Sequence, residues 1–239
     1  MTEAIFHVDA TVRQFDAVVV ATDSKTGITV LDRTAFYPGG GGQPCDHGVL
    51  SWGEVETRVQ RVAWGQKGVA HHLDGELPAV GTAVRGVLDW ERRHALMRTH
   101  TALHILCGVV WRDYGAQVTG GNMEPLAGRL DFEFERMSGE LVSEIETRIN
   151  AEVIAAREVR VNVLGREEAF QIPDLIRTKI NLVPASLQQI RTVEIVGLDL
   201  QADGGTHVMN TREVGAIRVA GYKSKGRINK RIQIELDGG

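Results

Sequence analysis

The stretch that decides the fold is residues 91–115, ERRHALMRTHTALHILCGVVWRDYG. Its apolar residues recur at the spacing of one helix face: Leu96, Leu103, Leu106 and Val110. This pattern predicts a helix from about Glu91 to Trp111. The chain has a different character on either side of it, so the start of the helix is also the expected boundary between two domains.

The residues before this helix predict strands. Runs such as VETRVQRVAW (55–64) and AVRGVLDW (83–90) alternate apolar and polar residues. Glycine-containing turns separate them, which is typical of a small antiparallel barrel or sandwich. We therefore expect residues 1–89 to form a β-rich N-terminal domain that also carries a glycine-rich loop.

Helices and strands mix after residue 90. Residues 138–157 predict a second helix that begins at the N-cap Ser138. The runs RLDFEFE (129–135) and INKRIQIEL (228–236) predict strands, and we expect Gly115, Gly120 and Gly121 to form a loop. The expected fold class is α+β, in which a small antiparallel β-barrel-like domain is followed by a two-layer α/β domain over residues 90–239.

Composition excludes several classes of protein. The chain has 239 residues, 43% of them hydrophobic, and a net charge of −4, which argues against disorder and against bulk nucleic-acid binding. No apolar run approaches the ~20 residues of a membrane-spanning helix. The N-terminus lacks the pattern of a secretory signal, and there are only two cysteines, Cys45 and Cys107. We therefore expect a cytoplasmic protein with reduced thiols.

The sharpest chemical feature is HTALH, residues 100–104 of the first helix. Residues four apart share a helix face, so His100 and His104 can point at one spot, as a metal ion requires. The segment lacks the glutamate of HExxH, so it does not indicate a zincin-type protease. On its own, the pair could be two surface or core histidines that happen to lie four residues apart.

A second element, DGGTH at residues 203–207, gives the pair a partner. The two glycines allow a tight turn that brings Asp203 and His207 back onto one site. With His100 and His104 they form a donor set of three nitrogens and one oxygen, which suits Zn²⁺. The alternatives are an ordinary turn carboxylate and a hydrogen-bonded histidine. Cys107 is a rival ligand, although we favour a packed apolar role for it.

A third element is TAFYPGGGGQP, residues 34–44. Consecutive glycines expose backbone N–H groups and allow close approach of a ligand. The segment is neither a phosphate-binding P-loop nor a dinucleotide fingerprint, because the required lysine and spacing are absent. Taken alone, it could be a mobile surface loop.

In this order, TAFYPGGGGQP, MRTHTALHIL (97–106) and DGGTHVMNTREVGAI (203–217) resemble the alanyl-tRNA editing family of medium-length type, freestanding relatives of the editing domain of alanyl-tRNA synthetase. The resemblance spans about Thr34 to Arg231. It implies hydrolysis of tRNA(Ala) that carries serine or glycine on its 3′ adenosine. No ATP-dependent ligase activity is expected, because the chain has no room for an aminoacylation core.

The resemblance also implies roles for residues. His100, His104 and His207 would bind zinc together with Asp203, which stands where the family usually has cysteine. Thr34 would meet the hydroxyl of the wrong amino acid. The pocket-lining segment would comprise Gly40, Gly41, Gly42 and Gln43, whose glycine N–H groups are candidate oxyanion donors. Aspartate is a harder ligand than cysteine, so the site would hold zinc more weakly or would have lost it.

Binding of the tRNA acceptor end needs basic side chains that neutralise its phosphates. Two clusters of basic residues are candidates, one around the first helix and one near the C-terminus: Arg92, Arg93, Arg98, Lys223, Lys225, Arg227, Lys230 and Arg231. The alternative is that these charged residues only form a solvent-exposed strand face. The sequence does not indicate the oligomeric state.

Three functions therefore remain open. The leading hypothesis is a zinc-dependent deacylase that edits mischarged tRNA(Ala) in trans. A second is a metal-dependent esterase acting on a small substrate. The third is a tRNA-binding accessory module with an inactive metal site, for which Asp203 is the best support.

Overall fold

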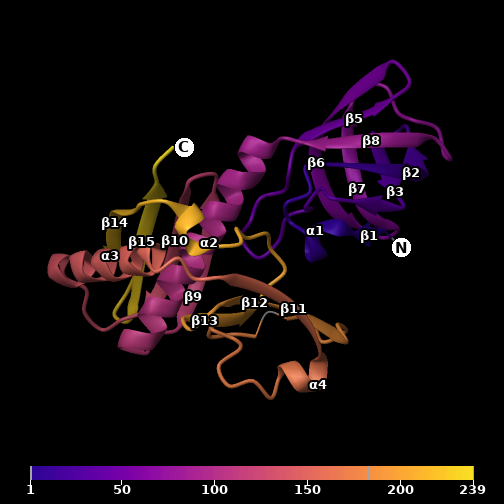
Figure 1. Ribbon diagram of the computed structural model, residues 1–239. Coiled ribbons are helices and arrows are strands. Elements are labelled where there is room, and N and C mark those ends of the chain that lie inside the picture. Colours follow the sequence, from indigo (N-terminus) through magenta and orange to yellow (C-terminus); the bar gives the residue numbers. More distant parts are fainter. Residues whose placement is uncertain (1, 182, 239) are drawn as a thin grey trace. The chain divides into compact units, whose positions relative to one another are not determined.

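The computed structural model describes residues 2–181 and 183–238 (Figure 1). The chain forms two compact units, Met1–Ala95 and Leu96–Gly239. None of the described helices combines the length and the apolar character needed to span a bilayer.

The N-terminal unit is a closed six-stranded barrel. Its strands, in order around the barrel, are β2 (Gln14–Asp23), β3 (Ile28–Leu31), β7 (Gly68–Asp74), β6 (Val55–Gly65), β5 (Gly48–Trp52) and β8 (Ala83–Leu88). All neighbouring pairs are antiparallel. A short helix α1 (Ile5–Val8) and a parallel pair, β1 (Glu3–Ala4) with β4 (Arg33–Thr34), complete the unit. The predicted barrel-like domain is confirmed.

Alternation along the strands explains the barrel core. Phe15, Ala17 and Val19 of β2 are buried, whereas the residues between them are exposed. Successive side chains of a strand point to opposite faces, so one face fills the barrel and the other meets water. The buried set also includes Phe36, which follows β4 and packs edge to face on Phe15 at a centroid distance of 5.6 Å.

The C-terminal unit is built on helix α2 (Trp90–Tyr114) from Leu96 onward. The helix begins one residue before the predicted start and ends three residues after the predicted end. Every residue from Leu96 to Val110 is buried. A helix buried all round needs small residues where its neighbours approach. A side chain at Gly128 of the adjoining sheet would lie 3.1 Å from Leu103, so that glycine lets the sheet pack closely on α2.

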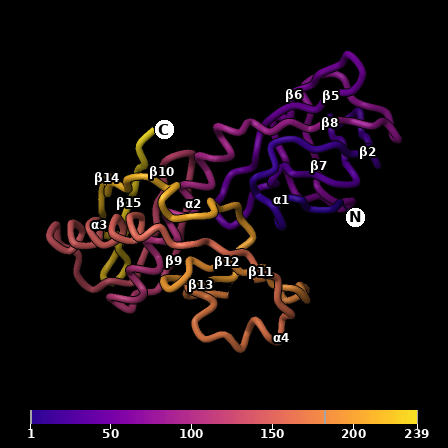
Figure 2. Tube along the Cα trace, viewed as in Figure 1, coloured from indigo at the N-terminus to yellow at the C-terminus, as the bar shows by residue number. Residues whose placement is uncertain are grey.

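Two sheets surround this helix. The first has the order β14 (Ile217–Ser224), β15 (Asn229–Leu236), β10 (Ala127–Glu133), β9 (Val118–Glu124), and helix α3 (Gly139–Ile154) packs on β14. The second has the order β11 (Val159–Gly165), β12 (Gln189–Ile195), β13 (Asp199–Ala202). Helix α4 (Arg166–Ala169) lies in the connection between β11 and β12 (Figures 1 and 2). The 3₁₀ helix η1 (Thr211–Val214) lies between β13 and β14.

Local signals account for the ends of these helices. Ser138 is the N-cap of α3, and its hydroxyl accepts a hydrogen bond from Leu141 N at 3.2 Å, as the sequence predicts. Gly115 follows α2 with a φ of 64°, and its N–H donates to Trp111 O at 2.9 Å. A glycine in this left-handed conformation is a common helix terminator.

The loop predicted at Gly115, Gly120 and Gly121 is wrong in its second half. Gly120 and Gly121 lie inside β9, where they pair with Asp131 and Leu130 of β10. A Cβ at Gly121 would lie 2.8 Å from the Leu130 side chain, so glycine here makes room for a cross-strand neighbour. Two adjacent glycines indicate a loop when only local sequence is considered, but tertiary packing decides otherwise.

A candidate metal centre

Four side chains from distant parts of the C-terminal unit converge on one point. His100 and His104 come from α2, and Asp203 and His207 from the turn after β13. Each offers one ligand atom, and these atoms all lie within 4.8 Å of one another. Asp203 Oδ1 is 3.5 Å from His100 Nε2, and Asp203 Oδ2 is 3.1 Å from His207 Nε2.

The backbone dictates this convergence. One helical turn separates the two histidines of α2, and their ring centroids are 5.1 Å apart. The second pair is fixed by a tight turn in which Gly205 N donates to Asp203 Oδ2 at 2.6 Å. Asp203 O in turn accepts a hydrogen bond from Arg191 Nη1 at 3.0 Å. Aspartate commonly binds the backbone two residues ahead in this way.

The electrostatics favour neutral imidazoles at His100 and His207 beside a charged carboxylate. Burial would lower the pKa of His104, but Asp199 and Asp203 outweigh that effect and raise it. Burial lowers the pKa of His100 to about 4, although Asp203 opposes the shift. Burial and the neighbouring His100 also hold the pKa of His207 well below its usual range. Burial would raise the pKa of Asp203, but His100 and His207 outweigh that effect and hold it well below its ordinary value. The neutral rings of His100 and His207 can therefore bind a cation without first losing a proton.

The donor set fits a divalent metal ion. Three imidazole nitrogens and one carboxylate oxygen suit Zn²⁺, whose bonds of about 2.0–2.2 Å place tetrahedral ligand atoms roughly 3.4 Å apart. Small side-chain movements would bring the group to that spacing from its present limit of 4.8 Å. Cys107 lies outside the group of ligand atoms, and burial raises the pKa of its thiol well above the ordinary value.

The contacts of two further polar residues were not foreseen from the sequence. Asp199, the first residue of β13, has a fully buried side chain with its Oδ2 at 3.3 Å from His104 Nδ1. Thr101 Oγ1 lies 3.2 Å from His207 Nδ1. For His207 this is the ring nitrogen opposite the Nε2 that contacts Asp203, and for His104 it is the nitrogen that contacts a carboxylate outside the group of four. A signal for Thr101 did exist, because it lies between the two histidines of α2, whereas nothing local marks Asp199.

In the N-terminal unit, Thr34 forms a buried pair with His71 of β7. Its Oγ1 is 2.9 Å from His71 Nε2 and also accepts a hydrogen bond from Phe36 N at 3.1 Å. His71 Nδ1 is 3.2 Å from the carbonyl oxygen of Thr29, which can only accept. Nδ1 therefore carries the proton, Nε2 accepts, and the Thr34 hydroxyl donates to it.

We predict that His71 makes the barrel sensitive to acid. Burial lowers the pKa of His71 from 6.5 to about 4, so the unfolded chain binds a proton more readily between these values. The stability that this residue supplies is present above pH 6.5 and is lost as the pH falls toward 4. In His71→Gln, whose amide oxygen can still accept from Thr34, the deficit in unfolding free energy against wild type should narrow by about 2 kcal/mol from pH 7 to pH 5.

Urea unfolding of both proteins in chelator at the two pH values measures this change. The other buried histidines are common to both proteins, so their titration cancels. A difference that stays constant with pH would contradict the prediction.

The glycine-rich loop follows Thr34 in the same unit. The φ angles of Gly40, Gly41 and Gly42 are 140°, 59° and 93°, all in the region that favours glycine. Gly40 N donates to Gln43 O at 3.0 Å, so this N–H is engaged within the loop and does not serve as an oxyanion donor in this conformation. Gly41 and Gly42 are exposed, whereas Gln43 is buried.

Two of the predicted RNA-binding arginines have structural roles instead. Arg93 is fully buried, pairs with Asp46 and donates to Ala10 O at 2.8 Å. Arg98 is 9% exposed and donates to the carbonyl oxygens of Val214 and Asp237. A guanidinium enclosed in this way offers little surface to a phosphate in this conformation.

The remaining basic residues differ in exposure. Arg92 is half-buried and donates to Cys45 O, and Arg231 forms an ion pair with Asp131. The ammonium group of Lys230 is buried and donates to two carbonyl oxygens of its own turn. The exposed cations are Lys223, Lys225 and Arg227, at the β14–β15 hairpin.

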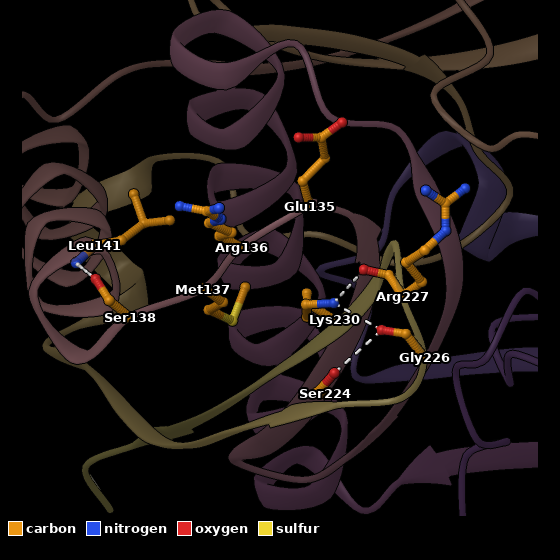
Figure 3. Close-up of a pocket in the computed structure, with 9 residues that line it drawn as sticks. All are labelled: Glu135, Arg136, Met137, Ser138, Leu141, Ser224, Gly226, Arg227 and Lys230. Atoms are coloured by element: carbon orange, nitrogen blue, oxygen red, sulfur yellow. Dashed lines mark hydrogen bonds between the residues drawn. The ribbon is translucent and has the colours of Figure 1, made fainter.

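Beside this hairpin lies an open pocket of about 860 Å³ (Figure 3). Arg227 and Lys230 line it from the hairpin, and Arg136, which is exposed, lines it from the connection between β10 and α3. We define the basic hairpin surface as Arg136, Lys223, Lys225 and Arg227. Arg136 was not predicted from the sequence because it stands alone in its segment.

Two segments of the chain, one from each end, match known protein families. Residues 2–92 match the family described as tRNA synthetases class II (A). Residues 190–233 match the family described as threonyl and alanyl tRNA synthetase second additional domain. The second match contains Asp199, Asp203 and His207.

Individual relatives agree with these matches. The chain is 37% identical to the alanyl-tRNA editing protein AlaX-M of Saccharolobus solfataricus, over 97% of this chain and 98% of the relative. It is 35% identical to the protein of the same name from Methanosarcina acetivorans, over 99% of both chains. It is also 37% identical to an alanine–tRNA ligase of Pyrobaculum aerophilum, over 91% of this chain but 25% of the ligase. At that identity and coverage, the chain belongs to the alanyl-tRNA editing protein family of AlaX-M type.

Proposed function

We propose that this protein hydrolyses the ester bond of tRNA(Ala) mischarged with serine or glycine, acting in trans and without ligase activity. The observation that carries the proposal is the convergence of His100, His104, Asp203 and His207, with all four ligand atoms within 4.8 Å. The names of the full-length relatives support the substrate class. The basic hairpin surface supports an RNA substrate over a small free ester.

The residues of the centre hold the metal and shape the site. A bound Zn²⁺ supplies Lewis acidity, which lowers the pKa of water toward ~7 and polarises an ester carbonyl. The half-buried Asp203 carboxylate provides the negative charge that balances such an ion. In the N-terminal unit, Gly41 and Gly42 are exposed residues, and their N–H groups are the candidate donors to a developing oxyanion.

Thr34 supplies a physical basis for choosing serine over alanine. Its hydroxyl proton is committed to His71, and one lone pair accepts from Phe36 N. The oxygen therefore offers a ligand one remaining lone pair, which selects a group that donates a hydrogen bond, such as the serine hydroxyl. Thr34 has no exposed surface, so a substrate reaches it only when the surrounding chain moves.

We predict that Thr34→Val lowers the preference for Ser-tRNA(Ala) over Ala-tRNA(Ala) by about 10- to 100-fold, because the valine side chain cannot accept a hydrogen bond from the serine hydroxyl. Zinc content should be unchanged, since Thr34 is not in the group of ligand atoms. Thr34→Ser, which keeps the hydroxyl, is the matched control. Ratios of kcat/KM for the two substrates measure the effect, and an unaltered ratio in the valine variant would count against this role.

We also predict that the basic hairpin surface makes tRNA binding salt-dependent. Removing one cation that neutralises a phosphate should reduce the slope of log K against log [salt] by about 1. Lys225→Ala and Arg227→Ala should each lower that slope in filter-binding titrations with tRNA(Ala). Arg160→Ala is the control, because Arg160 is an exposed arginine of β11 that already pairs with Glu158. Equal slopes in all variants would show that this surface does not bind the tRNA phosphates.

A single set of assays separates the three functions. We expect the zinc-loaded protein to deacylate Ser-tRNA(Ala) and to leave Ala-tRNA(Ala) nearly intact, and a chelator to stop the reaction. Hydrolysis of a seryl ester with equal efficiency with or without the tRNA would favour the small-substrate esterase. Tight tRNA binding with no turnover at any zinc concentration would indicate the accessory module.

A further inference from the structure

We propose that Asp199 is the positioning residue of the metal centre, holding His104 so that its Nε2 faces the other ligands. The inference rests on the metal centre of the proposed function. His104 Nδ1 lies 3.3 Å from Asp199 Oδ2. Imidazole has two nitrogens, and the one that faces a carboxylate carries the proton, which leaves the lone pair on Nε2 for a metal.

The surroundings show that His104 Nδ1 needs this partner. The atom is buried, and within the described part of the chain it makes no well-aligned hydrogen bond. A buried polar atom left without a partner costs about 1–3 kcal/mol, so such atoms usually have a nearby group that satisfies them. The carboxylate of Asp199 is in place for this role, and a small rotation of either side chain completes the bond.

Asp199 is itself held from two other directions. Gln201, two residues along β13, donates from Nε2 to Asp199 Oδ2 at 2.6 Å. Arg177 Nε donates to Asp199 Oδ1 at 3.3 Å, and the Arg177 guanidinium lies over the Trp111 ring at 4.9 Å. The guanidinium balances the charge of a carboxylate that has no exposed surface. These contacts leave Asp199 little freedom other than to face His104.

Helix α2 is adapted to this approach. Gly108 lies one turn after His104, and a Cβ there would come within 2.9 Å of both Asp199 Cβ and Leu198 Cγ. A glycine inside a helix is destabilising by roughly 0.5–1 kcal/mol relative to alanine. At this position it allows the turn before β13 to bring Asp199 against α2.

The same arrangement recurs at His207. Thr101 Oγ1 is 3.2 Å from His207 Nδ1 and also accepts a hydrogen bond from Val208 N at 3.3 Å. Two of the three imidazoles thus have the outward nitrogen next to a fully buried polar side chain. Side chains that fix ligand orientation in this way typically change metal affinity by about 10- to 100-fold when they are removed.

Metal binding to the full-length protein tests the proposal without RNA. Zn²⁺ affinity is measured by competition with a chromophoric chelator, and ligand geometry by the visible absorption of the Co²⁺-loaded protein. We expect Asp199→Ala to weaken Zn²⁺ binding by about 10- to 100-fold and to alter the Co²⁺ spectrum. Asp199→Asn should have a smaller effect, because its amide oxygen can still accept from His104; it also serves if the alanine variant fails to fold.

Asp131→Ala is the matched control. Asp131 is another buried carboxylate of this unit, but its partners are Arg129 and Arg231. Its removal should lower stability without changing either metal readout. Equal Zn²⁺ affinity and Co²⁺ spectra in wild type and both Asp199 variants would overturn the role of Asp199. A wild type that binds neither ion would overturn the metal centre as well, whereas binding without deacylation would overturn only the proposed function.

Discussion

Asp203→Ala should lose its metal ion and its deacylase activity together. The carboxylate is the one charged ligand of the group, and it contacts both His100 and His207. Without it, three neutral imidazoles must hold a divalent cation in a buried site with no balancing charge. We expect Zn²⁺ affinity to fall by more than about 100-fold, beyond the range for residues that only orient ligands.

Metal analysis after chelator-free purification, followed by Ser-tRNA(Ala) turnover with and without added Zn²⁺, measures the effect. Asp203→Cys is the informative control, because it restores an anionic ligand at the same position and should retain zinc. Asp203→Asn keeps the shape of the side chain but not its charge, and it should resemble alanine. If Asp203→Ala retained wild-type zinc content, the carboxylate would not be a ligand.

Asp46→Ala should destabilise the barrel by about 3–5 kcal/mol, because it leaves the buried Arg93 charge without its carboxylate. Arg93 Nε lies 3.0 Å from both carboxylate oxygens, and Arg93 is fully enclosed. Asp46 also accepts a hydrogen bond from Tyr37 N at 2.6 Å. The substitution should therefore also loosen the start of the glycine-rich segment.

Urea unfolding followed by tryptophan fluorescence measures this effect on the transition of the N-terminal unit. The double variant Asp46→Leu, Arg93→Met should recover part of the stability, since it removes both charges and fills their space with apolar atoms. Asp16→Ala, which breaks the exposed pair with Arg85, should change stability little. An Asp46→Ala protein as stable as Asp16→Ala would disprove the role of the buried pair.

The sequence was sufficient to predict the chemistry that depends on local spacing. The two histidines of α2 share a face because residues four apart always do, and the glycines after Asp203 indicate a tight turn. The barrel was predicted from the alternation of apolar and polar residues along the strands, because each strand of a closed sheet has one side facing the core and one side facing water. Each of these inferences uses a short-range rule that tertiary structure did not override.

The remaining features could not be predicted, because they depend on contacts between residues that are far apart in the sequence. Asp199 reaches His104 only because a glycine of α2 admits the turn before β13. In the sequence, nothing distinguishes Arg93 from a surface arginine. Its partner Asp46 lies 47 residues earlier in the chain, and only the fold brings the two together. His71 lies in a strand that no sequence motif singles out, so its pairing with Thr34 could not be foreseen.

The ring of six strands in the N-terminal unit has a consequence for self-association. An open sheet presents unpaired amide and carbonyl groups along its outer strands, where a second copy can add on. In the order β2, β3, β7, β6, β5, β8 the last strand pairs with the first, so the ring has no outer strand. The ring therefore offers a second copy no free outer strand to extend, which is a safeguard against fibre growth.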